Sequence, residues 1–199
     1  TPALAVRIGL DILAPRPPAL MVSGINYGEN LGSDVTVSGT VGAAIEAAVE
    51  GVPSVAVSLE AAVGYHDNPL GELDFSYAAA FARRVAQGVL RYGLPPGSDI
   101  LKVDVPGDAG PTTPWRLARV SRQRYWRTIV ENEPDGSKRI MGYERRIDRA
   151  TLEPDSDIHV FLLERAIPVS PMTVDLSTPV NGSTLASLRS ILGQEQPGG

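Results

Sequence analysis

The sequence predicts an α/β fold built on a parallel sheet, and three observations carry this prediction. Apolar runs at residues 19–22, 53–59 and 99–106 have the length and residue types of buried strands. Segments 39–51 and 75–92 between them show helical periodicity. Glycine and proline gather where one pattern changes to the other. Strand, helix and strand in this order form βαβ units, which place helices on the faces of a parallel sheet.

The first half of the chain begins with a predicted helix. Thr1 and Pro2 are typical of a helix start, because a capping side chain is followed by proline at the first helical position. Apolar residues continue at helical spacing to Leu13, and prolines in segment 14–18 end this helix. A strand at 19–22 then leads into a polar, glycine-rich loop, followed by the helices and strands given above.

The second half of the chain has a different character. Arginine and aromatic residues are interleaved, and an Asp135-Gly136 pair between two strand-like runs predicts a β-hairpin. A longer extended segment, with His159 in a strand, and a short amphipathic helix follow. We therefore expect residues 1–107 to form the α/β core and residues 108–199 to supply a hairpin arm, a returning strand and a C-terminal helix. The expected elements are strands at 125–132 and 137–146, an extended segment at 157–176 and a helix at 183–192.

Composition excludes several classes of protein. Hydrophobic residues make up 43% and charged residues 21% of the 199 positions, as in ordinary globular proteins. A net charge of −5 gives no general affinity for nucleic acid or for anionic membranes. The chain has no cysteine, so thiolate catalysis and cysteine metal sites are excluded. No apolar run approaches the roughly 20 residues of a membrane helix, and no signal peptide is recognised. We expect a cytoplasmic protein without membrane or nucleic-acid partners.

A candidate ligand site follows the first strand of the predicted core. The loop after residue 22 carries Ser23, Gly24 and Asn26, at the edge of the sheet where open α/β folds bind ligands. Ser38, Gly39 and Thr40 stand at the entry of the next helix, whose free N–H groups suit a phosphate. The same pattern also fits plain helix capping by Ser38 or Thr40. Both interpretations stay open on pattern alone.

A family resemblance extends this interpretation. The stretch "VSGINYGENLGSDVTVSGTVGAAIEAAVEGVPSVAVSL" closely resembles the SurE family of survival-protein nucleotidases. The segments "TPALAVRIGL", "LKVDVP", "WRLARVSRQRYW" and "RRIDRATLEPDSDIHVFLLERAIPVSPM" are similar to further family segments. The resemblance spans roughly residues 1–179. It implies a Rossmann-like SurE fold, with a three-layer α/β/α core and a protruding hairpin arm.

The resemblance also implies a reaction and a cofactor. Family members are metal-dependent phosphatases of nucleoside 5′- and 3′-monophosphates, of the acid phosphatase class, and use manganese or magnesium. By its place in "SGIN", Asn26 would be a metal ligand, and an amide oxygen suits these hard cations. Ser38, Gly39 and Thr40 would hold the phosphoryl group, while Ser23 and Gly24 would bind substrate or shape the turn that presents Asn26. The family's Asp-Asp-Gly metal-binding segment is not found in these 199 residues, and we expect it to lie upstream of Thr1.

The arginine-rich segment 115–149 has three interpretations. The resemblance favours contacts within a homodimer or homotetramer, and arginine, tryptophan and tyrosine suit interfaces. Contact with the substrate phosphate through Arg119, Ser121 or Arg122 is a second possibility, and nucleic-acid binding is a third.

Two alternatives to the nucleotidase remain open. In the first alternative, the chain is a catalytically incomplete fragment or a non-catalytic phosphate-binding and assembly module. In the second alternative, it is an unrelated phosphate-binding hydrolase. The unrelated hydrolase would need a carboxylate pair drawn from four aspartates: Asp34, Asp67, Asp74 and Asp104. Ser58, Glu60 and Asp104 also lie near strand ends, where they can approach the site, and His66 lies in a polar loop.

Overall fold

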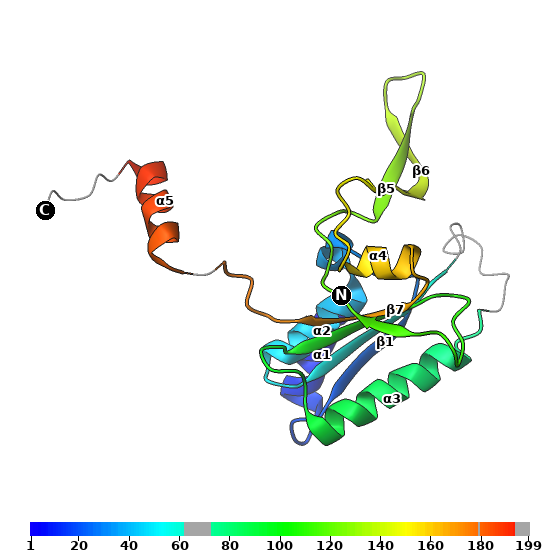
Figure 1. Ribbon diagram of the computed structural model, residues 1–199, viewed down its shortest axis with the longest axis vertical. Helices are drawn as coiled ribbons and strands as arrows, with labels where there is room; N and C mark the ends of the chain where they lie inside the picture. Colours follow the sequence, from blue (N-terminus) through cyan, green and yellow to red (C-terminus); the bar gives the residue numbers. More distant parts are fainter. Residues whose placement is uncertain (62–72, 179, 194–199) are drawn as a thin grey trace, which may run out of the picture.

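The computed structural model of the chain describes residues 1–61, 73–178 and 180–193. His66 and Asp67 lie outside these residues. Figure 1 shows a central sheet flanked by helices, a long β-hairpin that projects from it, and a C-terminal helix that stands apart.

The central sheet has five strands in the order β1-β2-β3-β7-β4. Strands β1, β2 and β3 are parallel, as the βαβ pattern predicts, because helices connect them. Strand β7 runs antiparallel to β3, and the short edge strand β4, which was not predicted, runs parallel to β7. The strands are β1 Met21–Tyr27, β2 Ser54–Leu59, β3 Ile100–Val105, β7 Ile167–Met172 and β4 Trp115–Leu117.

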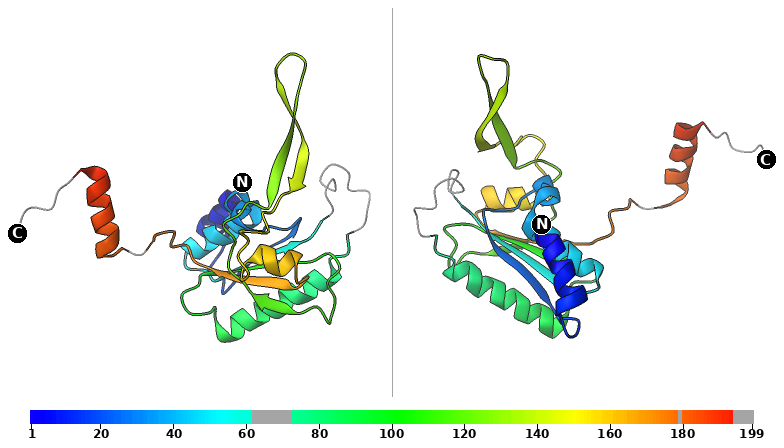
Figure 2. Two further views of the ribbon diagram at one scale, coloured as in Figure 1. Left: turned by 45° about the horizontal axis from the view of Figure 1, so that its top comes forward. Right: turned by 180° about the vertical axis from the view of Figure 1, so that it is seen from behind.

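Helices cover both faces of the sheet, so the predicted three-layer α/β/α core is confirmed. Helix α1 (Pro2–Ile8), extended by the π-helical turn η1 (Gly9–Leu13), packs beside α2 (Gly39–Val49) on one face. Helix α3 (Ser76–Tyr92) covers the other face (Figure 2). Thr1 Oγ1 accepts a hydrogen bond from the Leu4 N–H, which is the N-cap that the sequence predicted.

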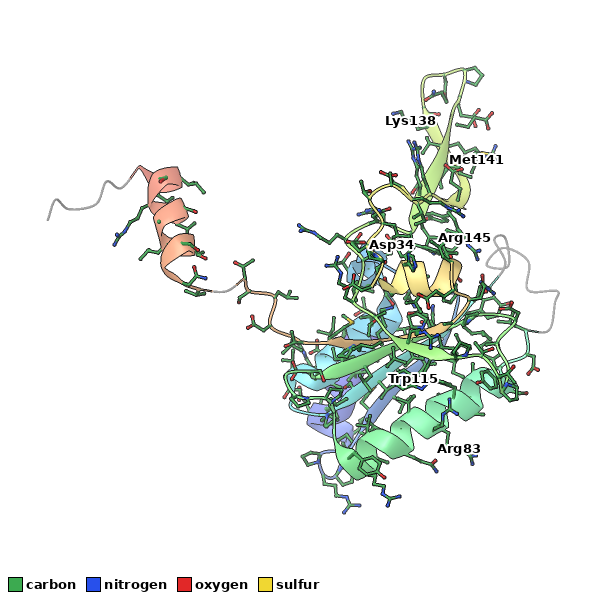
Figure 3. All side chains as sticks on the ribbon, viewed as in Figure 1. Asp34, Arg83, Trp115, Lys138, Met141 and Arg145 are labelled. Atoms are coloured by element: carbon green, nitrogen blue, oxygen red, sulfur yellow. The ribbon has the colours of Figure 1, made fainter. Side chains whose placement is uncertain are left out.

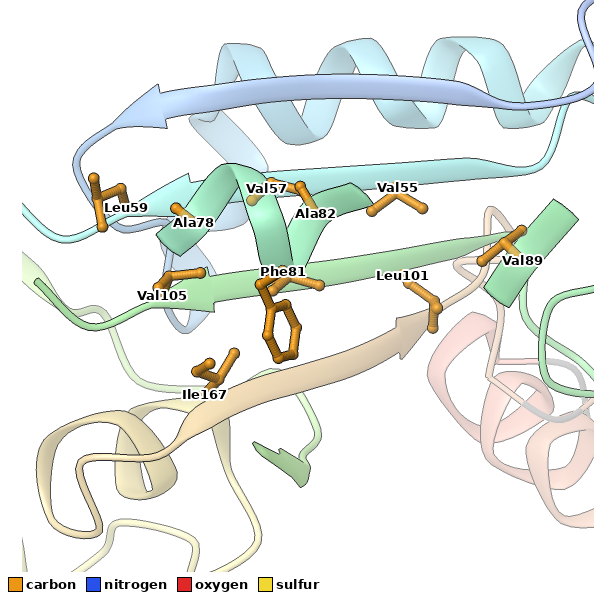
Figure 4. Packing of buried hydrophobic residues seen from close by; sticks show 11 residues of the cluster. Val55, Val57, Leu59, Ala78, Phe81, Ala82, Val89, Leu101, Val105 and Ile167 are labelled. Carbon is orange, nitrogen blue, oxygen red and sulfur yellow. The ribbon is translucent and has the colours of Figure 1, made fainter. Parts of the chain in front are cut away.

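The two faces of the sheet differ in chemistry. Alternate residues of β2 and β3 pack with α3 in the main apolar cluster (Figure 4), which includes Val57, Phe81 and Val103. The intervening residues of the same strands face the α2 side and include Ser58, Lys102 and Asp104, all of them buried. Strand alternation thus places an apolar layer on one side and a polar cluster on the other.

Strand β1 extends further than predicted. The sequence suggested a strand at 19–22 followed by a loop, but pairing with β2 continues to Tyr27, which lies opposite Leu59. The register shifts between Ser23 and Asn26, so Gly24 lies in an irregularity of the ladder. The loop prediction was wrong for residues 23–27 because β2, which is distant in sequence, supplies the hydrogen bonds that keep this polar stretch extended.

The predicted extended segment 157–176 was wrong in its first part. Residues Asp157–Leu162 form helix α4, and only Ile167–Met172 form a strand. Ser156 caps α4 by accepting a hydrogen bond from the His159 N–H. Burial at positions 157, 158, 160 and 161 follows helical spacing, so the apparent alternation around His159 was misleading. His159 lies on this helix and not in a strand.

The hairpin prediction is confirmed. Strands β5 (Trp126–Asn132) and β6 (Lys138–Arg145) pair antiparallel, and Gly136 in the turn has φ +82°. Figure 3 shows Lys138 and Met141 on the projecting part of the hairpin and Arg145 at its base. Helix α5 (Gly182–Leu192) begins at the N-cap Asn181 and has no buried residue.

Candidate functional site

Asn26 lies near the carboxyl end of β1, at the edge of the sheet expected to bind ligands. It is opposite Ser58 of β2 in the ladder and is partly buried. Its Nδ2 donates a hydrogen bond of 2.7 Å to the Gly28 carbonyl oxygen, which fixes the orientation of the amide. No described residue donates to Oδ1 of Asn26. The oxygen is therefore available for a cation or for a donor group of a ligand.

Gly24 allows the backbone of β1 to approach β2 just before Asn26. Its φ is +119°, and a Cβ placed there would lie 2.3 Å from the Val57 carbonyl oxygen and 3.1 Å from the Asn26 nitrogen. A side chain is thus excluded by contact as well as by backbone conformation. Ser23 is buried and pairs with Ala56, so it supports the strand more than it faces a ligand.

The amino end of α2 combines a cap with free N–H groups. Ser38 Oγ accepts a 3.1 Å hydrogen bond from the Val41 N–H, so the capping interpretation of Ser38 is correct. No described residue accepts a hydrogen bond from the N–H groups of Gly39 or Thr40. Because α2 follows β1 in a βα unit, this helix end faces the sheet edge at which open α/β folds generally bind ligands. These two N–H groups and the helix dipole suit an anion.

A buried charged cluster holds the segment that joins β1 to α2. Asn30 is bonded at three places: its N–H donates to Asp104 Oδ1 (2.7 Å), its Nδ2 donates to Ser58 Oγ (2.7 Å), and its carbonyl oxygen accepts from Lys102 Nζ (2.9 Å). Lys102 Nζ also donates to Asp104 and lies 3.0 Å from Asp157 Oδ2. Ser58 and Asp104, which the sequence placed near the candidate site, therefore contact the β1–α2 segment by hydrogen bonds with Asn30.

Asp157 extends this cluster to the base of the hairpin. Its Oδ2 accepts from the Gly32 N–H (3.0 Å) and its Oδ1 from the Ser121 N–H (2.9 Å). Burial opposes the charge of Lys102, but the charges of Asp104 and Asp157 outweigh it, so the pKa of Lys102 is raised. Lys102 therefore stays charged and ties β3, the β1–α2 segment and α4 together.

A second charged network joins the hairpin to the ends of β1 and β2. Arg145 lies 3.0 Å from Glu29 and 3.1 Å from Glu60, and Arg165 binds Glu60 and Asp108. Burial raises the pKa of Glu29. Burial also acts to raise the pKa of Glu60, but hydrogen bonds from Arg165 and Gly107 and the charge of Arg145 outweigh burial and lower it. The network thus holds Glu60 as a carboxylate at the carboxyl end of β2.

Most of the other predicted candidates are engaged elsewhere, although no described residue binds the Arg122 guanidinium. Arg119 pairs with Asp155 and Glu153, and Ser121 donates to Glu153, so their polar side-chain atoms already have protein partners. Among the described aspartates named for a carboxylate pair, each bonds a different group: Asp34 accepts from the Tyr125 and Trp126 N–H groups, Asp74 from the Ser76 N–H, and Asp104 from Lys102 and Asn30. They form no such pair.

The described residues do not by themselves fit a divalent metal. Asn26 offers one neutral oxygen, and Asp104, a buried carboxylate of β3, is held by Lys102. Within residues 1–61, 73–178 and 180–193, no group of three or more His, Asp and Glu side chains is placed to hold a metal ion. Magnesium and manganese prefer several oxygen ligands, at least one of them charged. Further donors would have to join Asn26.

Sequence reasoning missed Lys102, Asp157 and Glu29 as parts of this region. The signal for Lys102 was present, because it stands with Asp104 on one side of an otherwise apolar strand, "ILKVDV". Two charged residues on one side of a doubly covered strand predict a buried ion pair. No comparable local signal existed for Asp157, whose partners are 36 and 125 residues away along the chain.

Comparison with known proteins identifies the family. The family described as "Survival protein SurE" matches residues 1–127. The chain belongs to the SurE family. This confirms the resemblance noted in its sequence, and the part of the chain that the match covers includes every candidate residue from Ser23 to Thr40.

Individual relatives agree with this membership. The chain is 42% identical over 173 residues to the "5'-nucleotidase SurE" of Thermococcus gammatolerans, which covers 85% of this chain. It is 36% identical over 193 residues to the protein of the same name from Moorella thermoacetica, covering 96% of this chain and 70% of that protein. The crystal structure of the SurE protein from Aquifex aeolicus superposes with a TM-score of 0.74 at 27% identity, covering 96% of this chain and 73% of that one.

The chain is shorter than these SurE relatives. It spans 63% of the length of the Thermococcus gammatolerans protein. None of the helices that the structure describes combines the length and apolar character of a membrane-crossing segment.

Proposed function

We propose that this SurE-family chain functions as a metal-dependent phosphatase that hydrolyses nucleoside 5′- and 3′-monophosphates. The observation that carries the proposal is the free Oδ1 of Asn26 at the same edge of the sheet as the free N–H groups of Gly39 and Thr40. Support also comes from relatives that bear the name 5′-nucleotidase.

The described residues account for phosphate binding more fully than for catalysis. The N–H groups at the start of α2 and the Thr40 hydroxyl are suited to hold the oxygens of a phosphoryl group, where charge increases during transfer. Asn26 would be one ligand of a manganese or magnesium ion, which supplies Lewis acidity when bound. Because the described residues do not complete a metal site, no hydrolytic step is assigned to them.

This incomplete donor set favours a second candidate. The chain would then be a catalytically incomplete fragment or a phosphate-binding and assembly module that keeps the α2 cradle but does not hydrolyse its ligand. The two candidates differ in one measurable respect, since both bind phosphate monoesters and only the first releases inorganic phosphate from them.

Replacing Asn26 by alanine is expected to lower metal-dependent phosphate release about 100-fold, because a preorganised polar group at the reacting centre is lost. The assay measures phosphate released from nucleoside 5′- and 3′-monophosphates with manganese, with magnesium and with chelator. Asn132→Ala, at an exposed position at the end of β5, is the matched control and should leave the rate unchanged.

The assay separates the two candidates. Metal-dependent release that Asn26→Ala removes supports the nucleotidase. Nucleotide binding without release, measured by calorimetry on the same samples, supports the non-catalytic module. Metal-dependent release that persists in Asn26→Ala contradicts the role given to Asn26.

We also infer that the protein forms a homodimer or homotetramer through its hairpin arm and C-terminal helix. Helix α5 exposes apolar side chains with no partner in the described chain: Leu185, Leu188, Ile191 and Leu192. Figure 2 shows α5 standing away from the sheet in both views. An apolar helix side of this kind is stabilised by burial against another chain. A location in the cytoplasm stays a prediction.

Charge on the apolar side of α5 is expected to reduce the particle mass in solution. In Leu188→Glu a carboxylate replaces an apolar contact, so light scattering should detect a species of lower mass than the wild type. Ser190→Glu adds the same charge about 200° around the helix and should not change the mass. Equal masses for Leu188→Glu and the wild type would contradict an interface at α5.

A further inference from the structure

The Asn26 amide is oriented by the carbonyl group of a glycine. Asn26 Nδ2 donates to the Gly28 carbonyl oxygen at 2.7 Å, and this bond leaves Oδ1 of the same amide as the atom that can meet a ligand. Gly28 has φ +106°, and a glycine can adopt several other backbone conformations at little cost. Rotation of the peptide that joins Gly28 to Glu29 would remove the acceptor and let the Asn26 amide turn. The orientation of Asn26 therefore depends on what holds this peptide.

Contacts on both sides of this peptide hold it in place. On one side, the Gly28 N–H donates to the Leu59 carbonyl oxygen at 2.8 Å. On the other side, the Glu29 carboxylate is bonded through both oxygens: Oε1 accepts from Arg145 (3.0 Å) and Oε2 from the Ala61 N–H (3.3 Å). The Glu29 side chain is 0% exposed, so packing also restricts it. Anchoring this side chain fixes the Cα of Glu29 and with it the peptide plane.

Arg145, the last residue of β6, is itself held by the base of the hairpin. Its guanidinium carbon lies 5.6 Å from the ring centroids of both Tyr125 and Trp126, within the range of a cation–π contact. Its Nη2 also lies 3.1 Å from Glu60, at the end of β2. Asp34 accepts hydrogen bonds from the Tyr125 and Trp126 N–H groups, and Figure 3 shows Asp34 and Arg145 near the hairpin base. The base of the hairpin is thus fixed to the core before it reaches Glu29.

We propose that Glu29 and Arg145 are positioning residues, which hold the Gly28 carbonyl in place and through it direct the Asn26 amide oxygen toward the ligand. Arg145 acts on Glu29 by a charge-assisted hydrogen bond, and Glu29 acts on the peptide that follows Gly28. The hairpin would then support the site as well as project from the sheet. The consequence for turnover rests on the function proposed for Asn26, but the orientation of the amide can be measured without turnover.

Hydrogen exchange of the Asn26 side chain measures this orientation. In the ¹⁵N-labelled chain, the Nδ2 proton bonded to Gly28 should exchange with water more slowly than a free amide proton, and its resonance is assigned by its loss in Asn26→Ala. We expect Glu29→Ala and Arg145→Met to accelerate this exchange about tenfold, as for the loss of one charge-assisted hydrogen bond. Glu29→Gln should keep most of the protection, because glutamine has the same size and its amide oxygen still accepts a hydrogen bond.

A second ion pair of the hairpin supplies matched controls. Arg139 is also an arginine of β6 and lies 3.8 Å from Glu133, near the turn of the hairpin. Arg139→Met and Glu133→Gln should change the Asn26 exchange by less than about twofold. The backbone N–H groups of β3 are followed in the same spectra, because a loss of global stability would accelerate their exchange as well.

Kinetics connect the orientation of Asn26 to turnover. In Glu29→Ala, kcat for phosphate release should fall about tenfold while KM changes less than about twofold, because the N–H groups of Gly39 and Thr40 stay in place. In an Asn26→Ala background, Glu29→Ala should cause no further loss, as expected for residues that act through one another.

Four results would overturn the proposal. Unchanged Asn26 exchange in Glu29→Ala and Arg145→Met would show that the amide is held without them. Equal acceleration of the Asn26 and β3 protons would reduce their role to global stability. A loss in Glu29→Gln as large as in Glu29→Ala would assign Glu29 a role that depends on its charge. An equal loss of kcat with and without Asn26 would separate the two residues.

The two arms also distinguish this proposal from the function on which it rests. No phosphate release by the wild type would contradict the proposed phosphatase, and the exchange measurements would still decide the positioning role. Release by the wild type together with unchanged Asn26 exchange in the variants would contradict the positioning role alone.

Discussion

Replacing Lys102 by methionine is expected to lower the free energy of unfolding by about 3–5 kcal/mol, because it leaves buried carboxylates without their cation. Lys102 is wholly buried, and its ammonium group contacts Asp104, Asp157 and the Asn30 carbonyl oxygen. Methionine fills a similar volume, so packing changes little while the charge is lost. Urea unfolding followed by circular dichroism measures the change.

The chain offers a matched control for this prediction. Lys138, its other lysine, is exposed on β6, and Lys138→Met should change stability by less than about 0.5 kcal/mol. Adding Asp104→Asn to Lys102→Met should recover part of the loss, because one uncompensated charge is removed. A loss below about 1 kcal/mol for Lys102→Met would contradict the clamping role of this cluster.

Replacing Gly24 by alanine is expected to cost about 3 kcal/mol of stability or more, since it combines a forbidden contact with a strained backbone. The added Cβ would lie 2.3 Å from the Val57 carbonyl oxygen, and a backbone atom of the central sheet has little freedom to move away. Relief of this contact would displace β1 from β2 and with it Asn26. Both the unfolding free energy and nucleotide binding should therefore fall together.

Gly42→Ala provides the opposite outcome at another glycine. Gly42 is within α2, and a Cβ there meets nothing within 4 Å. Alanine should stabilise the helix by about 0.5–1 kcal/mol, because glycine loses more conformational freedom on folding. If Gly24→Ala were as stable as the wild type, the close approach of β1 to β2 would not be a requirement of the fold.

Local periodicity predicted most of the secondary structure correctly. Helices α1, α2, α3 and α5, strands β2 and β3 and the hairpin all follow from apolar spacing, caps and turn residues. These signals depend on residues two to four positions apart, so they can be read directly from the sequence. The prediction was wrong at β1 and α4, where pairing with β2 and the Ser156 cap outweighed the local pattern.

The candidate site was only partly predictable. The "SGIN" and "SGT" stretches pointed to Asn26 and to the start of α2, but not to what holds them in place. Lys102 contacts a carboxylate 55 residues further along the chain, and Arg145 contacts Glu29, 116 residues away. Sequence spacing contains no information about such pairs.

The sequence by itself determined the α/β class, the hairpin, the SurE family and the presence of polar residues at and after the carboxyl end of β1. Only the tertiary structure decided that Ser38 serves as a cap, that Lys102 is enclosed between two aspartates, and that Arg145 of the hairpin binds Glu29. The physical reason is that capping and periodicity arise from neighbours along the chain. Burial and charge pairing arise from groups that meet only when distant segments pack together.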